Sequence, residues 1–466
     1  MSAEEGEDRV ELADSAPARA AAQVVAGLRA AGHAAWWVGG CVRDLALGLP
    51  PKDYDVATSA LPADVGQIFS HVVEVGVAFG VVRVRERPAS GGNRVEIEVA
   101  TFRADGGYSD GRHPDNVRFT DAREDVIRRD FTINGLLLDP LGEDGGLARS
   151  GRIVDFVSGL DDLRAGVLRA IGDPDARFEE DALRLLRAVR FAARFGLTIE
   201  AATAAAISGR AATLTRVSAE RIRDELGAMC GGPDPVGAVS LLGRFGLLEP
   251  LWPALARMDP GLRLASARFA AASAALAARP PPSRPQQGGL AMATTITLPL
   301  GFALIFADLV APHAAAPIPL ADLAAALRLS RADGRTLAHL VVVAHELAAL
   351  AADPPTGPVS LFGGVPVAVV RLLRDGHGDA ALVAALADPA LTTRQREQLL
   401  AWRACRASVP ASGWCPDLVV DGRALQALGR RPSPRFKLAL LAAEDAQIAG
   451  EDPLAAALAA LDLTLR

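Results

Sequence analysis

The sequence predicts an α+β domain near the N-terminus, followed by a longer all-helical part. Between residues 22 and 140, short apolar β-like runs alternate with helix-like segments, and Gly or Pro marks most of the changes. From residue 121 onward nearly every segment has a helical pattern, apart from a β-like run at 152–157. Alanine, the residue with the highest helix propensity, dominates the second half, which supports the same division.

The elements of the N-terminal part are expected to form a small mixed sheet with helices. Glycine ends the first two helices, at Gly32 and Gly48, and Pro62 opens the third. The Gly- and Asp-rich stretch 103–119 is expected to be a loop. In chain order the sequence predicts a helix over 21–32, a strand at 34–40, a helix over 41–48, a strand at 53–58, a helix over 63–70, a hairpin of strands at 72–76 and 79–86, and a strand at 94–102.

Composition narrows the class of protein. A chain of 466 residues has room for roughly two to four domains, and its net charge of −6 argues against a non-specific nucleic-acid coat while allowing a local basic groove. The four cysteines are scattered and form no CxxC pair, so we expect neither a disulfide framework nor a zinc site. This cysteine usage is typical of a protein in the reducing cytoplasm, where we expect the chain to reside. Residues 1–17 are acidic and lack an apolar core, which predicts a disordered lead-in rather than a signal peptide.

One stretch has to be weighed as a membrane span. Residues 290–307 carry no charge over about the minimum spanning length, which is roughly 17 residues. Pro299 and Gly301 interrupt the run, and Asp308 follows at once. We therefore expect a pair of buried helices and no membrane association.

The pair Asp53 and Asp55 is the first candidate for chemistry. Residues two apart on a strand point to the same face, with Cα atoms roughly 6.5–7 Å apart, so both carboxylates can reach one magnesium ion. Two solvated acids on an exposed strand are the alternative, and on its own the DxD pattern does not decide between them.

Glycines precede this pair at a helix start. Gly39 and Gly40 allow backbone N–H groups to approach a phosphate, and the positive end of the helix dipole favours an anion there. Arg43 lies one turn into the same helix and can hold a triphosphate oxygen. An ordinary strand–turn–helix corner is the alternative.

A third carboxylate is available from the strand at 94–102. Glu96 and Glu98 share one face of it, and if this strand lies beside the strand of Asp53 and Asp55, one of the two completes a metal site. We favour Glu98; otherwise both glutamates face water.

Two polar clusters follow. The first contains Arg128, Arg129, Asp130 and Asn134 and leads into an apolar segment. Arginine clamps phosphate, and Asp and Asn suit ribose hydroxyls. A solvated, capped helix start is the alternative.

The second lies in an expected helix over 178–196, where one face carries Asp181, Arg184 and Arg187 and the opposite face carries Leu185, Leu186 and Val189. Asp181 and Arg184 can read the edge of a base, or they form an ordinary intrahelical ion pair.

The histidines offer no comparable site. His339 and His345 sit in an apolar helix without metal-ligand spacing, and the "DGHGD" stretch at 375–379 lacks the partners of a metal phosphohydrolase.

Taken together, four motifs resemble the bacterial class II tRNA nucleotidyltransferases (CCA-adding enzymes) and the related poly(A) polymerases. They are "WWVGGCVRDLALGLPPKDYDVATSALP", "EVATFRADGGYSDGRHPDNVRF", "EDVIRRDFTINGLLL" and the segment 153–197, which contains "EEDALRLLR". The resemblance is specific because the motifs keep their order and spacing over about residues 36–197, and it continues more weakly into the tail.

The resemblance implies a DNA polymerase beta-like nucleotidyltransferase palm followed by an all-α neck, body and tail. With these names, the expected parts are a lead-in at 1–21, a catalytic palm at 22–140, a base-recognising neck at 141–200, a helical body at 201–280, a Pro-rich linker at 281–289, and a tRNA-binding body and tail at 290–466.

It also implies roles for residues of the head. Asp53 and Asp55 would bind Mg²⁺, with Glu98 as the third catalytic carboxylate that the strand pattern suggests. The nucleotide would be held by Gly39, Gly40 and Arg43 at the triphosphate and by Arg129, Asp130 and Asn134 at ribose and phosphate.

Further implied roles lie in the flexible loop and the neck. Arg112 and Asp115 would belong to a flexible loop that helps to switch between nucleotides. Asp155, Gly159 and Asp162 would form the spring between head and neck, and Asp181 and Arg184 would pair with the incoming base, supported by Arg187.

The chain departs from the family pattern at two places. His113 stands where the loop motif usually has arginine, which bears on a loop contact. Ser433 and Arg435 stand where the tail usually has a glycine-rich turn, which bears on how the tail meets tRNA.

These expectations lead to template-independent addition of C, C and A to the 3′ end of tRNA from CTP and ATP, with no obligate protein partner implied. A poly(A) polymerase is the first alternative, but it typically has a basic C-terminal extension and lacks the "DGRHPD" type of loop. Enzymes that add only CC or only A, and a non-catalytic RNA-binding protein with a decayed palm, are the others.

Overall fold

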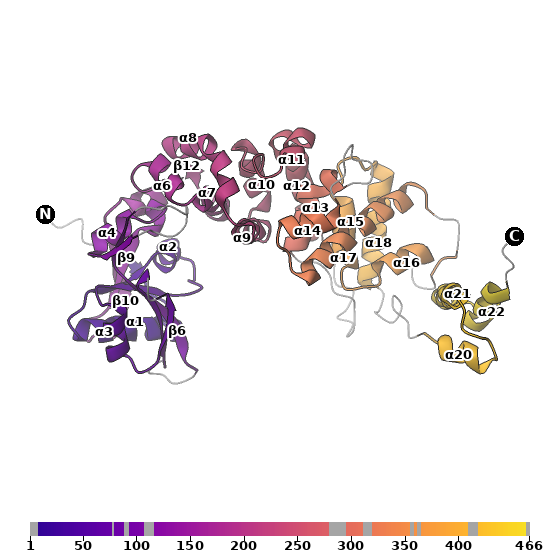
Figure 1. Cartoon of the computed structure of the whole chain (residues 1–466), viewed down its shortest axis with the longest axis horizontal. Helices are drawn as coiled ribbons and strands as arrows, with labels where there is room; N and C mark the ends of the chain where they lie inside the picture. The colour runs from indigo at the N-terminus through magenta and orange to yellow at the C-terminus, as the bar shows by residue number, and fades with distance from the viewer. Residues whose placement is uncertain are drawn as a thin grey trace. The chain divides into compact units, whose positions relative to one another are not determined.

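The computed structural model describes residues 8–76, 79–87, 93–106, 116–278, 295–310, 319–354, 358–360, 365–408 and 418–462 (Figure 1). The chain divides into two compact units, one of residues 1–218 with 245–251 and one of residues 219–244 with 252–466. The first unit is mixed and the second is helical, as the sequence predicts. The predicted linker at 281–289 lies outside the described residues.

An eight-stranded mixed sheet organises the first unit. Its order is β1-β10-β9-β2-β3-β6-β5-β4, and every neighbouring pair is antiparallel except β3 and β6. Helix α1 contacts six of these strands and therefore covers one face of the sheet. The strands of the sheet are β1 (Arg9–Glu11), β2 (Ala35–Val38), β3 (Asp55–Thr58), β4 (Val72–Gly76), β5 (Val81–Glu86), β6 (Val95–Thr101), β9 (Leu136–Leu141) and β10 (Leu147–Asp155).

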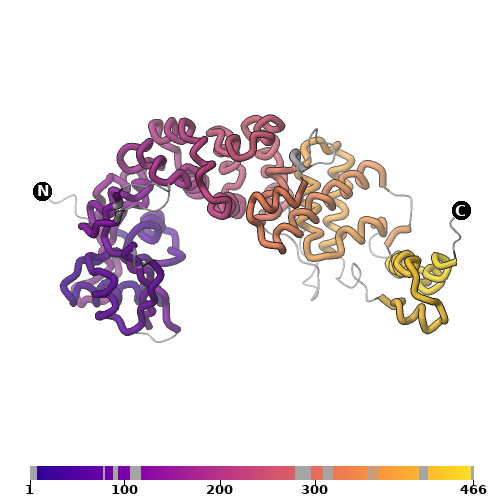
Figure 2. The backbone as a smooth tube through the Cα atoms, in the orientation of Figure 1, coloured from indigo at the N-terminus to yellow at the C-terminus, as the bar shows by residue number. Residues whose placement is uncertain are grey.

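Helices and short strands complete the unit. Figure 2 traces them in sequence order from indigo to magenta. The helices are α1 (Ala16–Ala30), α2 (Gly40–Ala46), α3 (Pro62–Ile68), α4 (Ala122–Ile127), η2 (Thr132–Asn134), α5 (Gly159–Arg164), α6 (Pro174–Glu180), α7 (Leu183–Phe195), α8 (Ala201–Gly209) and η3 (Ala211–Arg216). The short strands are β7 (Arg103–Gly106), β8 (Asn116–Phe119), β11 (Val167–Leu168) and β12 (Thr198–Ile199).

The sequence misplaces the start and the end of the sheet. The expected lead-in at 1–21 contains β1 and the first turn of α1, which the Ser15 side chain caps by accepting from the N–H of Ala18. Strand β10 extends the sheet past residue 140, and β1 pairs with it. The expected loop at 103–119 has paired strands, β7 and β8, at its two ends.

The expected single helix over 178–196 is wrong. Helix α6 ends at Glu180, and Asp181 has extended backbone angles (φ −146°, ψ 102°). Its carboxylate Oδ1 accepts from the N–H of Leu183 at 3.0 Å, near the start of α7. Asp181 therefore separates two helices, because its short polar side chain supplies the acceptor that a helix start needs. The expected apolar face of α7 is confirmed, since Leu185, Leu186 and Val189 are fully buried.

The second unit consists of helices. They are α9 (Ala219–Cys230), α10 (Pro235–Arg244), α11 (Pro253–Met258), η4 (Pro260–Leu262), α12 (Arg263–Ala277), α13 (Leu298–Val310), α14 (Leu320–Ala326), α15 (Arg331–Ala352), α16 (Val367–Leu373), α17 (Gly378–Leu386), α18 (Thr393–Ser408), α20 (Gly422–Ala427), α21 (Arg435–Ala449) and α22 (Pro453–Asp462). The last three have an apolar cluster of their own, formed by Val420, Leu425, Ala439, Ala443 and Ala457.

Of the apolar stretch 290–307, the structure describes residues 295–307, which contain one core helix, α13; residues 290–294 of the expected helix pair lie outside the described residues. Pro299 and Gly301 do not break α13 but lie in its first turn, where proline is tolerated. Phe302 and Phe306 are fully buried, and a Cβ on Gly301 would lie 2.4 Å from the Cys230 sulfur, so α13 packs closely on α9. Among the described residues, α15 alone is long and apolar enough to cross a membrane by length and composition, and it packs against α13, α17 and α18.

Candidate active site

The two predicted metal-binding carboxylates lie at the start of β3. Asp53 is exposed just before the strand, and Asp55 is its half-buried first residue. Strand β6 runs parallel to β3, and Glu98 lies directly opposite Asp55 in the register. The condition under which Glu98 was favoured, that the glutamate strand lies beside the aspartate strand, is therefore met.

The surroundings of Asp55 raise the pKa of its carboxyl group. Burial, followed by the negative charges of Glu98 and Asp53, raises the pKa of Asp55 to about 6, and Arg129 opposes this. A carboxylate at a strand end with two acidic neighbours is under-compensated, which is what a cation would correct. Among the described residues, no three His, Cys, Asp or Glu side chains are gathered closely enough to hold a metal ion, so Glu98 as a third ligand stays a prediction.

A cleft of about 220 Å³ opens beside Asp55 and Glu98. Three arginines, Arg103, Arg128 and Arg129, line it together with these two carboxylates. A site with neighbouring positive and negative groups suits a metal–phosphate complex, in which the cation meets carboxylates and the phosphate oxygens meet guanidinium groups.

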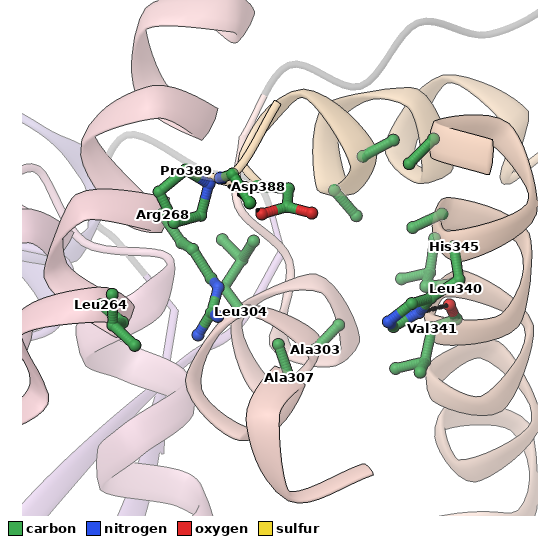
Figure 3. A pocket seen from close by; sticks show the side chains of 15 residues that line it. Leu264, Arg268, Ala303, Leu304, Ala307, Leu340, Val341, His345, Asp388 and Pro389 are labelled. Atoms are coloured by element: carbon green, nitrogen blue, oxygen red, sulfur yellow. Dashed lines mark hydrogen bonds between the residues drawn. The ribbon is translucent and has the colours of Figure 1, made fainter. Parts of the chain in front are cut away.

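A larger cavity of about 370 Å³ lies in the helical unit, between α12, α13, α15 and α17 (Figure 3). Alanine, leucine and valine form most of its wall, and Asp388 is the one carboxylate among its lining residues. Because it lacks paired carboxylates, we place the chemistry in the smaller cleft of the first unit.

The two glycines stand where β2 meets α2. Gly39 has a positive φ of 70°, which a side chain disfavours, and its N–H donates to Leu136 O at 3.1 Å. A Cβ on Gly39 would lie 3.1 Å from Nη1 of Arg129, so glycine leaves room for this guanidinium. Of the arginines predicted to bind phosphate, Arg129 is therefore the one that lies against Gly39.

Arg43 does not lie in the cleft. It is only 4 % exposed, and its guanidinium donates to Asp44 Oδ1 at 2.6 and 2.9 Å and to Asn134 Oδ1 at 2.6 Å. It also lies over the ring of Phe195, with the guanidinium carbon 4.5 Å from the ring centroid. In this structure Arg43 organises neighbouring side chains, and its direct contact with a triphosphate stays a prediction.

Asp130, Asn134 and Arg187 form a continuous polar network with Arg43. Asn134 donates to Asp130 Oδ1 at 3.0 Å, and Arg187 donates twice to Asp130 Oδ2, at 2.6 and 2.9 Å. Burial raises the pKa of Asp130, but Arg187 and Asn134 outweigh it and bring that pKa to about 2. The structure thus brings together four of the predicted nucleotide-binding residues and fixes Asp130 as an anion.

Asp181 and Arg184 lie on neighbouring elements rather than on one helix face. Arg184 donates through Nη1 to Glu180 Oε2 at 2.6 Å and through Nη2 to Arg128 O at 3.2 Å. The alternative of an Asp181–Arg184 ion pair on one helix is wrong, because Glu180 takes that partner. The pairing of both residues with a base stays a prediction.

Of the three predicted spring residues, Gly159 and Asp162 lie at the contact between α5 and η2, and Asp155 binds the start of α5. Asp155 accepts from the N–H groups of Val157 and Leu160, both at 2.9 Å, at the start of α5. Thr132 of η2 donates its hydroxyl to Asp162 at 2.7 Å. A Cβ on Gly159 would lie 2.1 Å from Thr132 O, so only glycine allows this approach. Arg112 and Asp115 lie outside the described residues.

The sequence did not reveal a group of aromatic and arginine side chains on α7. Phe191 and Phe195 stack with their centroids 6.2 Å apart, and Arg194 lies over Phe195 at 4.8 Å. Arg194 also pairs with Asp44 at 3.5 Å. The i, i+4 spacing of the two phenylalanines was the available signal, but it does not say that an arginine of α2 inserts there.

Two family models match parts of the chain. Residues 35–169 match the model described as "Poly A polymerase head domain", and residues 196–258 match "Probable RNA and SrmB- binding site of polymerase A". Residues 35–169 are thus similar to the head domain of poly A polymerases. This head contains the carboxylates, the glycines and the arginine-lined cleft described above.

Individual proteins extend the comparison. The chain is 42 % identical over 246 residues to the CCA-adding enzyme of Lactiplantibacillus plantarum, covering 53 % of this chain and 56 % of that protein. It is 39 % identical over 252 residues to the CCA-adding enzyme of Geobacillus stearothermophilus, covering 54 % and 58 %. The chain thus spans about half the length of the curated relatives it matches.

Solved structures resemble nearly the whole chain. The Bacillus stearothermophilus CCA-adding enzyme in complex with CTP has a TM-score of 0.66 at 29 % identity, covering 93 % of both chains. The Thermotoga maritima CCA-adding enzyme complexed with tRNA has a TM-score of 0.64 at 17 % identity, covering 95 % of both, which shows a shared fold. The fold predicted from the sequence, a polymerase beta-like head with a helical remainder, is confirmed.

Proposed function

We propose that this protein is a tRNA nucleotidyltransferase that adds CCA to the 3′ end of tRNA from CTP and ATP and releases pyrophosphate. The observation that supports this most directly is the cleft of the head, where Asp55 and Glu98 face Arg103, Arg128 and Arg129. The relatives that share this head are named CCA-adding enzymes, and one of the similar structures is a complex with CTP.

A divalent cation fits the acidic end of this cleft. Asp55 has a raised pKa because it is buried beside Glu98 and Asp53, and a cation there would offset these charges. Asp53 and Asp55 would hold it, as carboxylate oxygens suit Mg²⁺. When bound, magnesium supplies a lowered pKa for the attacking hydroxyl and charge compensation for the leaving pyrophosphate.

The residues of the chain provide position and charge. Arg129, beside the Gly39 backbone, would bind the triphosphate, because a guanidinium group matches the geometry of phosphate oxygens. Asp130, an anion held by Arg187 and Asn134, would accept a hydrogen bond from a ribose hydroxyl. Asp181 and Arg184 would read the edge of the base, so that a wrong base leaves buried polar groups unpaired.

Nucleotide incorporation into a tRNA that lacks CCA tests the proposal. We expect CTP and ATP together to yield the complete CCA end, and Asp55→Ala to abolish addition while tRNA binding survives. Incorporation by Asp55→Ala at a rate comparable to the unmodified protein would contradict the role of Asp55.

The same assay separates the alternatives. Long A-tails with ATP alone would indicate a poly(A) polymerase, whereas products that stop after CC, or that contain only A, would indicate a partial enzyme. Absence of incorporation with and without magnesium would favour a non-catalytic RNA-binding protein.

A further inference from the structure

Asp125 is a buried carboxylate between the arginines of the cleft. It lies on α4, is 1 % exposed, and does not line the cleft itself. Its Oδ1 accepts from Arg128 Nε at 3.0 Å and Nη2 at 2.7 Å, and its Oδ2 accepts from Arg129 Nε at 3.3 Å and Nη2 at 3.0 Å. One carboxylate thus contacts the same edge of two consecutive guanidinium groups.

Backbone contacts hold this arrangement from the other side. The N–H of Arg103 donates to Asp125 Oδ1 at 3.3 Å, and Arg128 Nε donates to Arg103 O at 2.9 Å. Strand β7 and helix α4 are thereby joined at Asp125, where all three arginines of the cleft meet. Each of Arg128 and Arg129 is about a fifth exposed, so both retain access to the cleft.

We propose that Asp125 is a positioning residue that directs Arg128 and Arg129 together toward a triphosphate, and that Arg128 is a second phosphate-binding arginine beside Arg129. The inference rests on the proposed function for the identity of the nucleotide but not for the phosphate chemistry. Long arginine side chains lose rotamer freedom when they bind, and a carboxylate that holds both beforehand reduces that loss.

Arg128 also connects phosphate binding to the neck. Its carbonyl accepts from Arg184 Nη2 at 3.2 Å, and the neighbouring Ile127 carbonyl accepts from Arg177 at 3.4 Å. The residue that we place on the triphosphate is therefore bonded through its backbone to the predicted base-reading arginine. A shift of α4 would move both contacts at once.

Asp125→Asn has two opposite effects on the affinity of the cleft for phosphate, one through charge and one through the position of the arginines. Removal of a buried negative charge makes the cleft more positive, which alone would strengthen anion binding. Loss of the carboxylate also releases the two arginines from their shared partner, which weakens binding if positioning dominates. The sign of the change in affinity therefore distinguishes a positioning residue from a merely neutralising one.

The test is calorimetric titration of the full chain with inorganic tripolyphosphate in the presence of magnesium. For Asp125→Asn we expect the dissociation constant to rise about tenfold. Asp139→Asn is the matched control. Asp139, on β9, also pairs with an arginine, Arg29, but it does not line the cleft. Unchanged or tighter binding by Asp125→Asn would overturn the inference.

Two arginine variants keep the test decisive if Asp125→Asn does not fold. Arg128→Gln removes the guanidinium, and Arg128→Lys retains the charge but cannot offer Asp125 two donors from a rigid fork. We expect both to weaken tripolyphosphate binding similarly, and full affinity in Arg128→Lys would overturn the positioning role.

Activity separates this inference from the proposed function. If CTP is incorporated, Asp125→Asn should raise the KM for CTP more than it lowers kcat, because the lost contact acts on binding. If the unmodified protein incorporates no nucleotide, the proposed function fails, yet the tripolyphosphate result still decides the role of Asp125. An unmodified protein that does not bind tripolyphosphate would overturn the inference itself.

Discussion

Replacement of Asp55 by asparagine should stabilise the protein while it abolishes activity. Asp55 has a pKa of about 6 in the folded chain, against a usual value of 3.8, because it is buried beside Glu98 and Asp53. The folded state therefore binds a proton that the unfolded state has lost between these pH values. Stability consequently falls as the pH rises from about 4 to about 6, and the loss persists at higher pH.

The size of the expected gain in unfolding free energy follows from the pKa shift of Asp55. About two pKa units correspond to about 3 kcal/mol, and solvent screening of this half-buried group reduces the expected effect to about 1–3 kcal/mol. Asparagine resembles the neutral acid, so Asp55→Asn should be more stable than the unmodified protein by this amount at pH 8 in a chelator. The advantage should shrink as the pH falls through 6 toward 4.

Hydrogen exchange of the β2, β3 and β6 amides is the appropriate assay, because two compact units need not unfold together. At pH 8 we expect protection in Asp55→Asn to rise by roughly 5- to 150-fold. Glu96→Gln is the control, since this side chain is 44 % exposed on the same strand as Glu98, and it should change little. An advantage that is missing at pH 8, or that is equally large at pH 4.5, would refute the reasoning.

Three further predictions concern the network around this site. Gly159→Ala places a Cβ 2.1 Å from Thr132 O and should lower the free energy of unfolding of the head by about 1–3 kcal/mol or more, measured by urea unfolding. An unchanged free energy of unfolding would mean that α5 shifts freely. Asp130→Asn should cost about 2 kcal/mol at neutral pH, because the lowered pKa of Asp130 contributes stability that is present above about pH 4 and is lost as the pH falls toward 2. Unfolding curves at several pH values check this, and a gap that does not narrow in acid would contradict it. Phe195→Leu removes the ring under Arg43 and should cost about 0.5–2 kcal/mol by thermal unfolding, whereas the same change at Phe156, an exposed phenylalanine, should cost less.

Alternation along the strands put Asp53 and Asp55 on one face of their strand and Glu96 and Glu98 on one face of theirs. Whether the two strands are neighbours depends on the sheet order, which this local pattern does not contain, and the register puts Glu98 opposite Asp55. Such a local pattern could not predict that Arg43 is buried. Its burial depends on Phe191 and Phe195, which come from a helix about 150 residues later in the chain and insert against α2.

Helix boundaries were less predictable for a similar reason. The segment 178–196 has a continuous helical pattern, but Asp181 has extended backbone angles and accepts from the N–H of Leu183, so it separates α6 from α7. Asp125 was also unremarkable in the sequence, because its partnership with two arginines depends on the turn of α4 against β7. Local pattern identifies such residues poorly when a tertiary contact decides their role.

The pairing of β1 with β10 sets an order of events during synthesis. Arg9 lies opposite Arg152, so the first strand of the chain forms an edge of the sheet only after about 150 residues have left the ribosome. Contacts this distant in sequence are slow to form. Until then β1 has no partner in the sheet, and the emerging head presents the open edge of β9 to whatever binds nascent chains.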